Sequence, residues 1–250
     1  MKIKLRNLVI LKIAIKAVVL LCLYAYPSTA QSPASQNSKE PIEITADETL
    51  EWHRNQKQFI ARENAQAVQG DVSIKASTLT ADYIDGNGQS MEINRVQADN
   101  NVRIRSRDTD AYGDKAIYEI DKGYAEMTGS DLKMVSPDQI VTARDRFEYW
   151  VTDGRLIAIG NARITRKNEQ GEVNTLDADV ITAYLKENAE GERVLDRMVA
   201  EGNVVITTPT ETLTGQQGVY EANTNQAEVT GNVEIKRGPN TLEGSRATVD

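Results

Sequence analysis

Apolar and polar residues alternate along most of the chain, and one short phrase carries this pattern six times. The phrase is a glycine, or Asn100 in its place, followed by polar residues and then by an apolar–x–apolar triplet. Its copies are Gln69–Ile74, Asp99–Ile104, Thr128–Met134, Ile159–Ile164, Glu201–Ile206 and Thr230–Ile235. The glycine position advances by 30, 29, 31, 42 and 29 residues. A period of this size indicates stacked copies of one supersecondary unit.

The phrase itself predicts a β-strand. In Val102-Arg103-Ile104 the two apolar side chains lie at i and i+2 with a charge between them. Successive strand side chains point to opposite faces, so each copy has one dry face and one wet face. The Gly-Asn or Gly-Asp before it supplies turn chemistry, because these residues tolerate left-handed backbone conformations.

A second half-motif follows each copy and reads apolar, polar, small. Its six occurrences are Leu79–Ala81, Ala111–Gly113, Val141–Ala143, Leu176–Ala178, Leu213–Gly215 and Leu242–Gly244. A small residue at a fixed strand position indicates a close approach or a sharp bend. Each repeat then gives two longer strands and in places a short third, or roughly 14–18 strands at common lengths.

The repeat that begins at Gly160 is enlarged. Its extra residues are polar and predict two extended hairpin loops, at 167–171 and 186–191. The segment 180–190 is the best candidate for a helix, although no helical period longer than two turns stands out anywhere in the chain.

The N-terminus predicts a secretory signal. Residues 1–16 carry five basic residues and no acid, 17–26 are almost purely apolar, and small residues precede Ala30. Ten apolar residues are too few to span a bilayer, which takes about 20, so cleavage after Ala30 is favoured over an uncleaved anchor. Residues 31–40 are polar and predict a flexible tether before one domain at 41–250. The expected location is outside the cytoplasm.

The composition of the chain that remains after cleavage excludes some classes of function. The only cysteine, Cys22, lies in the signal, so the secreted chain has neither disulfides nor thiol chemistry. Removing five basic residues from 29 leaves 24 against 37 acids, a net charge of −13. A strongly acidic domain repels phosphates, so nucleic acid is not an expected partner.

No constellation of catalytic or metal-binding residues stands out, and we expect no enzyme activity, metal or cofactor. His53 is the only histidine, and its place in Trp52–Asn55 predicts a turn. The carboxylate pairs Asp108/Asp110 and Asp177/Asp179 have the residue type of calcium or glycosidase sites, but a solvated face explains them better in so acidic a chain. Trp52 and Trp150 fit ordinary edge packing better than a ligand slot.

The dry face is aliphatic, with only two phenylalanines in the chain. Such an interior suits a thin filled core or a slot for a thin aliphatic ligand. The inward residues from the repeats are Val72, Ile74, Val102, Ile104, Leu132, Met134, Ile164, Val204, Ile206, Val233 and Ile235.

Several segments together resemble the lipopolysaccharide-transport protein A family (LptA, or OstA-like). They are the opening Pro41–Asp47, Leu50–Trp52, Ala61–Ala65 and Gln69–Leu79, followed by the repeated Gly-Asn-Val phrases behind a secretory signal. The order and spacing of these segments are more specific than any one of them, and the resemblance covers Ile42 to Asp250.

The resemblance implies an all-β fold, an antiparallel, open, V-shaped β-jellyroll (β-taco). It also implies a periplasmic bridge that carries lipopolysaccharide (LPS) from the inner membrane to the outer-membrane translocon. The acyl chains of lipid A would lie against the eleven inward residues. The implied partners are an LptC-like inner-membrane protein, an LptD-like translocon and further copies of the chain, joined end to end.

Two other functions fit the same sequence. One is the LptC-like partner of that pathway, which keeps its N-terminal anchor. The other is an extracytoplasmic structural β-repeat protein without a lipid ligand. Under the transport hypothesis, the lipid phosphates are expected outside the roll, either in solvent with counterions or near the arginines of repeats two to four: Arg103, Arg105, Arg107, Arg144, Arg146, Arg163 and Arg166.

Overall fold

A computed structural model describes residues 43–85, 91–167, 171–189, 191 and 193–249. The predicted signal and tether lie outside these residues. Every regular element described is a strand: β1 (Glu43–Thr45), β2 (Thr49–His53), β3 (Gln58–Gln69), β4 (Val72–Asp85), β5 (Met91–Ser106), β6 (Thr109–Glu119), β7 (Tyr124–Thr128), β8 (Leu132–Val135), β9 (Gln139–Ala143), β10 (Arg146–Trp150), β11 (Arg155–Lys167), β12 (Val173–Glu187), β13 (Arg193–Thr207), β14 (Thr212–Glu221), β15 (Gln226–Arg237) and β16 (Asn240–Val249).

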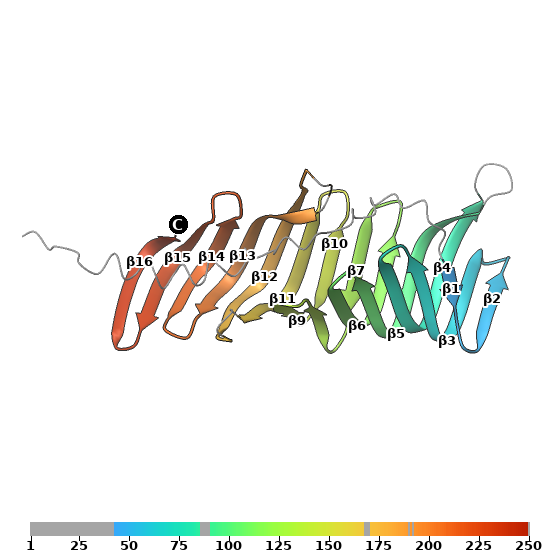
Figure 1. Cartoon of the computed structure of the whole chain (residues 1–250), viewed down its shortest axis with the longest axis horizontal. Helices are drawn as coiled ribbons and strands as arrows, with labels where there is room; N and C mark the ends of the chain where they lie inside the picture. The colour runs from blue at the N-terminus through green and yellow to red at the C-terminus, as the bar shows by residue number, and fades with distance from the viewer. Residues whose placement is uncertain (1–42, 86–90, 168–170, 190, 192, 250) are drawn as a thin grey trace, which may run out of the picture.

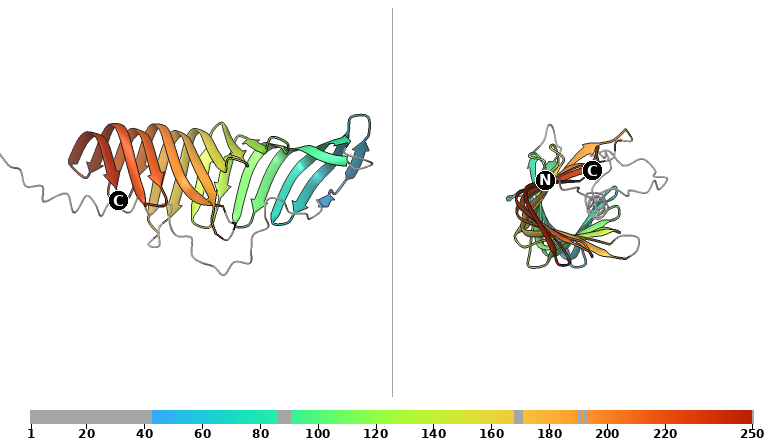
Figure 2. Two further views of the ribbon diagram at one scale, coloured as in Figure 1. Left: turned by 90° about the horizontal axis from the view of Figure 1, so that it is seen from above. Right: turned by 90° about the vertical axis from the view of Figure 1, so that its left-hand side faces the viewer.

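All sixteen strands belong to one antiparallel sheet, which confirms the predicted fold class and strand number. The main path runs β1-β3-β4-β5-β6-β7-β10-β11-β12-β13-β14-β15-β16, with β2 beside β3 and with β8 and β9 filling the gap between β6 and β11. The strands cross the long axis of the molecule (Figure 1). Seen from one end, the sheet curls into an open roll (Figure 2).

The long strands share an apex, at which the register between neighbours slips. Between β13 and β14, for example, regular pairing stops at Glu201 and Gln217 and resumes at Val204 and Gly215, so two residues of β13 lie opposite one residue of β14. The bulged strands place two consecutive residues at positive φ here, such as Gly202 (+76°) and Asn203 (+48°). A bulge of this kind bends a strand and sharpens its twist, so the aligned bulges fold the sheet into a V.

The apex divides the sheet into two arms. The first arm contains the apolar–x–apolar triplets and comprises 43–45, 65–69, 72–76, 102–106, 109–113, 132–143, 162–167, 173–178, 204–207, 212–215, 233–237 and 240–244. The second arm comprises 49–62, 78–85, 91–99, 115–128, 146–159, 180–187, 193–201, 217–221, 226–230 and 246–249.

The prediction that Gly-Asn makes a turn before each strand is wrong for most repeats. Gly160-Asn161, Gly202-Asn203 and Gly231-Asn232 lie inside continuous strands of 12 to 15 residues, at the apex. The same left-handed conformation serves a hairpin turn and a bulge, so residue type alone does not separate them. Gly70 does lie in a turn between β3 and β4, and the matching bulge of β3 is Glu63-Asn64.

The helix considered for 180–190 is also wrong where the structure describes it, because β12 continues to Glu187. Part of the enlarged repeat is therefore strand: β12 and β13 have 15 residues each and pair as far as Glu187 and Arg193. Residues 168–170 and 190, in the predicted loops, lie outside the described residues, as does residue 192.

One apolar cluster runs along the inside of the roll from β3 to β16. Its floor is the row of residues that follow the apex bulges. All are at most 3% exposed: Ala65, Val102, Leu132, Ala162, Val204 and Val233. The small residues of the second half-motif allow close approach as predicted, since a Cβ on Gly113 would lie 2.7 Å from Cγ of Met127.

Candidate functional site

The candidate site is the groove between the two arms. Ten of the eleven predicted interior residues belong to the apolar cluster or pack against it. Six are buried: Val102, Leu132, Val204, Ile206, Val233 and Ile235. Ile74, Ile104, Met134 and Ile164 are half-buried on the walls. The exception is Val72, the first residue of β4, which is 41% exposed because it lies at the rim.

The groove opens into a cavity of about 290 Å³ near the middle of the roll. Its lining comes from β4 to β11 and includes three predicted residues, Ile74, Ile104 and Met134. The remaining lining is mainly apolar and was missed by the sequence analysis: Val96, Ala98, Ala111, Ala116, Ile117, Tyr118, Ala125, Met127, Phe147, Tyr149 and Leu156, with Ser106, Thr109, Glu126 and Glu148. Most of the missed residues belong to the second arm, which the repeated triplet does not reach.

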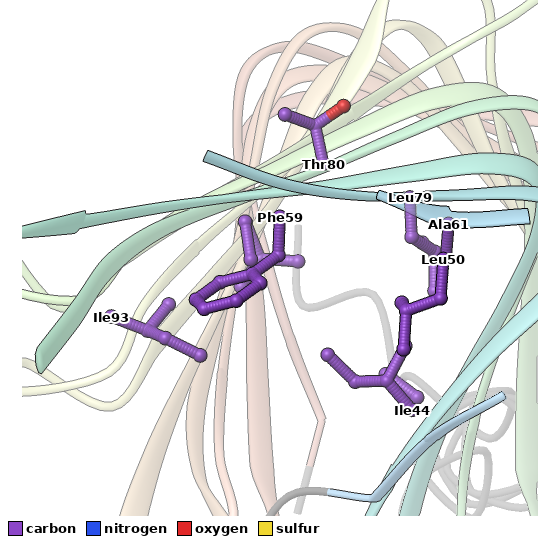
Figure 3. A pocket seen from close by; sticks show the side chains of 10 residues that line it. Ile44, Leu50, Phe59, Ala61, Leu79, Thr80 and Ile93 are labelled. Atoms are coloured by element: carbon purple, nitrogen blue, oxygen red, sulfur yellow. The ribbon is translucent and has the colours of Figure 1, made fainter. Parts of the chain in front are cut away.

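A smaller cavity of about 30 Å³ lies at the N-terminal end. Leu50 and Ile44 approach it from one side, and Phe59 and Ile93 from the other (Figure 3). The apolar interior therefore reaches the first strands of the roll, beyond the repeats recognised in the sequence.

Aromatic side chains line the inner rim of the second arm. Trp52 stacks on Phe59 with 5.8 Å between ring centroids, and Phe59 contacts Tyr83. Trp52 Nε1 donates a hydrogen bond of 3.0 Å to the Tyr83 hydroxyl. Farther along the groove, Tyr118 and Tyr149 line the large cavity. Trp150 instead packs on Tyr124, with 4.6 Å between ring centroids, and is not among the residues that line either cavity.

The outer face of the first arm is covered by ion pairs. Arg103 and Arg105 both bind the Asp110 carboxylate, at 2.9 and 3.0 Å. These hydrogen bonds hold the pKa of Asp110 well below its usual range. Arg163 pairs with Asp177 in the same way. Three of the seven arginines expected near lipid phosphates, Arg103, Arg105 and Arg163, thus already have carboxylate partners on this face. Arg144 pairs with Asp145 in the β9–β10 connection, and Arg146 pairs with Glu148 in the second arm.

Arg166 does not lie on the outside of the roll, where the sequence analysis placed it. It follows Ala162 and Ile164 in the inward alternation, and only 8% of it is exposed. Its guanidinium binds Asp138 at 3.0 Å. Arg166 therefore belongs to the groove and not to the outer face.

The remaining polar candidates have structural partners. His53 Nε2 lies 2.6 Å from the Glu51 carboxylate, and bonds from His53 and then Arg62 lower the pKa of Glu51 to about 2. Asp179 accepts a hydrogen bond from Asn203 at the apex. Among the described residues there is no group of three or more His, Cys, Asp or Glu side chains with metal-binding geometry.

The repeated architecture corresponds to a known family. The family model described as "LptA/(LptD N-terminal domain) LPS transport protein" matches the sequence twice, over residues 43–145 and 145–250. The chain belongs to this family of LPS transport proteins. The two matches meet at Asp145, in the short connection between β9 and β10, where the sheet is split into short strands.

One solved structure matched by this chain is that of LptH, "the LptA homologous periplasmic component of the conserved lipopolysaccharide transport device from Pseudomonas aeruginosa". The alignment covers 81% of this chain and 99% of that chain at 12% identity, with a TM-score of 0.26. No curated protein matches the sequence. In the part of the chain that the structure describes, no helix is long and apolar enough to cross a membrane.

Proposed function

We propose that this protein is a periplasmic LPS-binding bridge, whose groove holds the acyl chains of the lipid between the inner membrane and the outer-membrane translocon. The observation that carries the proposal is the uninterrupted apolar interior, which runs from β3 to β16 and widens to about 290 Å³. Membership in an LPS transport family supports the choice of ligand.

The groove is long enough to hold lipid along its axis. The main path of the sheet has thirteen strand positions, and strands lie about 4.8 Å apart, so the groove is about 60 Å long. Burying one methylene group contributes about 0.8 kcal/mol, so a 12-carbon chain gains about 9 kcal/mol on leaving water. A dry groove therefore lowers the barrier to crossing an aqueous compartment without any chemical step.

In this proposal the eleven predicted interior residues, Val72 at the rim included, contact acyl chains. The chain acts in the periplasm after cleavage behind Ala30, as one domain over 41–250 preceded by the tether at 31–40. It works without enzyme activity, between an LptC-like protein and an LptD-like translocon.

End-to-end association of copies extends the same groove. β1 in the first arm, β2 in the second arm and β16 across both point in the same direction, from the first arm toward the second, because the path has an odd number of strand positions of alternating direction. Within the described residues β16 pairs with β15 alone. The free edge of β16 could pair with β1 and β2 of a second copy so that the two grooves form one continuous groove. The strands at this joint would then be parallel. Strand addition of this kind is a common use of free sheet edges.

A photo-crosslinking residue at position 104, in a strain that makes LPS, tests the ligand. Ile104 lines the cavity, whereas Arg103 next to it faces outward and serves as the control position. Labelling of LPS from position 104 and not from 103 supports the bridge. Labelling of neighbouring strands alone would show a filled structural core. N-terminal sequencing of the protein recovered from the periplasm distinguishes a bridge that begins near Gln31 from an anchored partner.

A further inference from the structure

At the rim of the first arm, in the C-terminal half of the roll, the inward-facing positions are occupied by polar residues. On β13, Val204 and Ile206 are followed inward by Thr208, and the same step leads from Ile164 to Arg166 and from Ile235 to Arg237. On the two chain segments between them, the inward positions two residues before Leu176 and Leu213 are Asn174 and Glu211. We call these five residues the rim row: Arg166, Asn174, Thr208, Glu211 and Arg237.

The rim row is continuous across five neighbouring strands. Arg166 is paired directly with Asn174. The pair Thr175 with Thr207 places Asn174 beside Thr208, and the pair Thr212 with Lys236 places Glu211 beside Arg237. Four strand spacings of about 4.8 Å make a polar line about 19 Å long, parallel to the groove.

These side chains are far more buried than rim residues usually are. Arg166, Asn174, Thr208 and Glu211 are between 3% and 8% exposed. The row also balances its charges, since Arg166 binds Asp138 at 3.0 Å and Arg237 binds Glu211 at 2.8 Å. Thr208 Oγ1 accepts the Glu211 backbone N–H at 3.2 Å.

Asn174 is the exception within the row. Asn174 is only 3% exposed, and its Oδ1 has no hydrogen-bond partner among the described residues. Buried amide oxygens in folded proteins nearly always accept a hydrogen bond, because burial without one is costly. The oxygen is shielded from solvent, so a molecule bound in the groove can supply the missing donor when the Asn174 side chain turns toward it.

We propose that Asn174 Oδ1 accepts a hydrogen bond from a hydroxyl or amide N–H carried on, or next to the head of, an acyl chain bound in the groove. The inference rests on the proposed function, because the acyl chain would lie against Val204 and Ile206 on the same wall. A neutral donor fits better than an anion, since the two nearby arginines are already paired with Asp138 and Glu211. The rim row therefore selects among lipids by their polar groups while the groove holds their chains.

The corresponding rim of the N-terminal half lacks this arrangement. There the inward residues are Val72 and Ser106, which are exposed, and Thr109 and Ser136, which are half-buried. On the rim of the first arm, the unpartnered acceptor among the described residues thus belongs to the C-terminal half, and the selection should depend on that half.

Two fatty acids that differ by one hydroxyl test the inference with the full secreted chain. Dissociation constants for tetradecanoic and 3-hydroxytetradecanoic acid are measured by calorimetry for the wild type, for Asn174→Leu and for a control, Asn223→Leu, in the exposed β14–β15 turn. The wild type and the control should bind the hydroxy acid about fivefold more tightly than tetradecanoic acid, from one added hydrogen bond. Asn174→Leu should lose this preference and keep its affinity for tetradecanoic acid.

Thermal unfolding of the ligand-free proteins separates a binding role from a structural one. Asn174→Leu removes a buried unpartnered acceptor at similar volume, so its Tm should equal or exceed that of the wild type. Equal affinities for the two acids in the wild type, or a preference that persists in Asn174→Leu, would overturn this inference and leave the acyl groove standing. Failure of both acids to bind would overturn the groove and the rim row together.

Discussion

The two arms of the roll share a floor but differ at their rims. The first arm ends, in its C-terminal half, in the buried polar rim row, and it carries arginine–aspartate pairs on its outer face. The second arm is aromatic along its inner side, where Tyr83 and Tyr220 are 6% and 5% exposed. An amphiphile bound in this groove would therefore contact an apolar floor, the polar rim of the first arm and the aromatic rim of the second arm.

This difference assigns separate tasks to the arms. The floor and walls supply non-directional apolar contact, which fits chains of varied structure. Under the proposed function, the rim row would supply directional hydrogen bonding and so fix the orientation of a bound lipid. The outer arginines do neither, because their partners are carboxylates of the protein itself.

The largest expected effect is that of a charge on the inner face of the first arm. Ile206→Glu places an unpaired carboxylate at a position 8% exposed. It should abolish LPS capture and lower the free energy of unfolding by about 3 kcal/mol. Urea unfolding and co-purification of LPS measure the two effects. The matched control is Val205→Glu, one residue away on the opposite face. If both variants capture LPS like the wild type, the inner face does not bind the lipid.

The apex that joins the arms should respond to a single methyl group. Gly202 has φ +76°, and a Cβ there would meet the Asp179 carboxylate, so Gly202→Ala should cost about 1–2 kcal/mol. Gly218 in the second arm has room for a Cβ, whose nearest neighbour would be Val204 Cγ1 at 3.6 Å. Gly218→Ala should be neutral or stabilise by up to about 1 kcal/mol. Denaturant midpoints give both values, and similar losses in the two variants would argue against a strained apex.

Acid should weaken the ion pairs of both arms. Asp110 in the first arm has a pKa held below its unfolded value, so the stabilisation from its pairing is present above about pH 4 and is lost as the pH falls further. In the second arm the pKa of Glu51 is about 2, so its contribution fades between about pH 4.3 and its folded pKa. Asp110→Asn and Glu51→Gln should each flatten the fall in unfolding free energy below pH 4. A curve parallel to that of the wild type would show that the pair is absent.

The smallest expected effect is on the outer face of the first arm. Arg103→Gln removes one half-exposed partner of Asp110 and should change stability by less than about 1 kcal/mol, and less at high salt. LPS capture should stay at the wild-type level. A marked loss of capture would instead place a lipid headgroup on this face, as the sequence alone had suggested.

The period-2 pattern predicted the strands, their approximate number and the inward side chains of the first arm, because it fixes which side chains share a face. The open roll was predicted from the resemblance to the LptA family, and the lining contributed by the second arm was missed. Val204 and Ile206 were identified from the period-2 pattern alone. The same alternation extends two residues farther to Thr208 and Arg166, but polar residues at inward positions read as the end of a strand. Their burial depends on neighbouring strands, which no local pattern specifies. Gly202-Asn203 was misassigned for a related reason, since a bulge and a turn need the same conformation.

The central claim is that the inside of the first arm contacts the transported lipid and the outside does not. Nitroxide labels at positions 164 and 163 test it most directly, because Ile164 is half-buried on the groove wall while Arg163 is exposed on the outer face. Addition of LPS should immobilise the label at 164 and leave the spectrum of the label at 163 unchanged. An unchanged spectrum at 164, or equal immobilisation at both positions, would contradict the account.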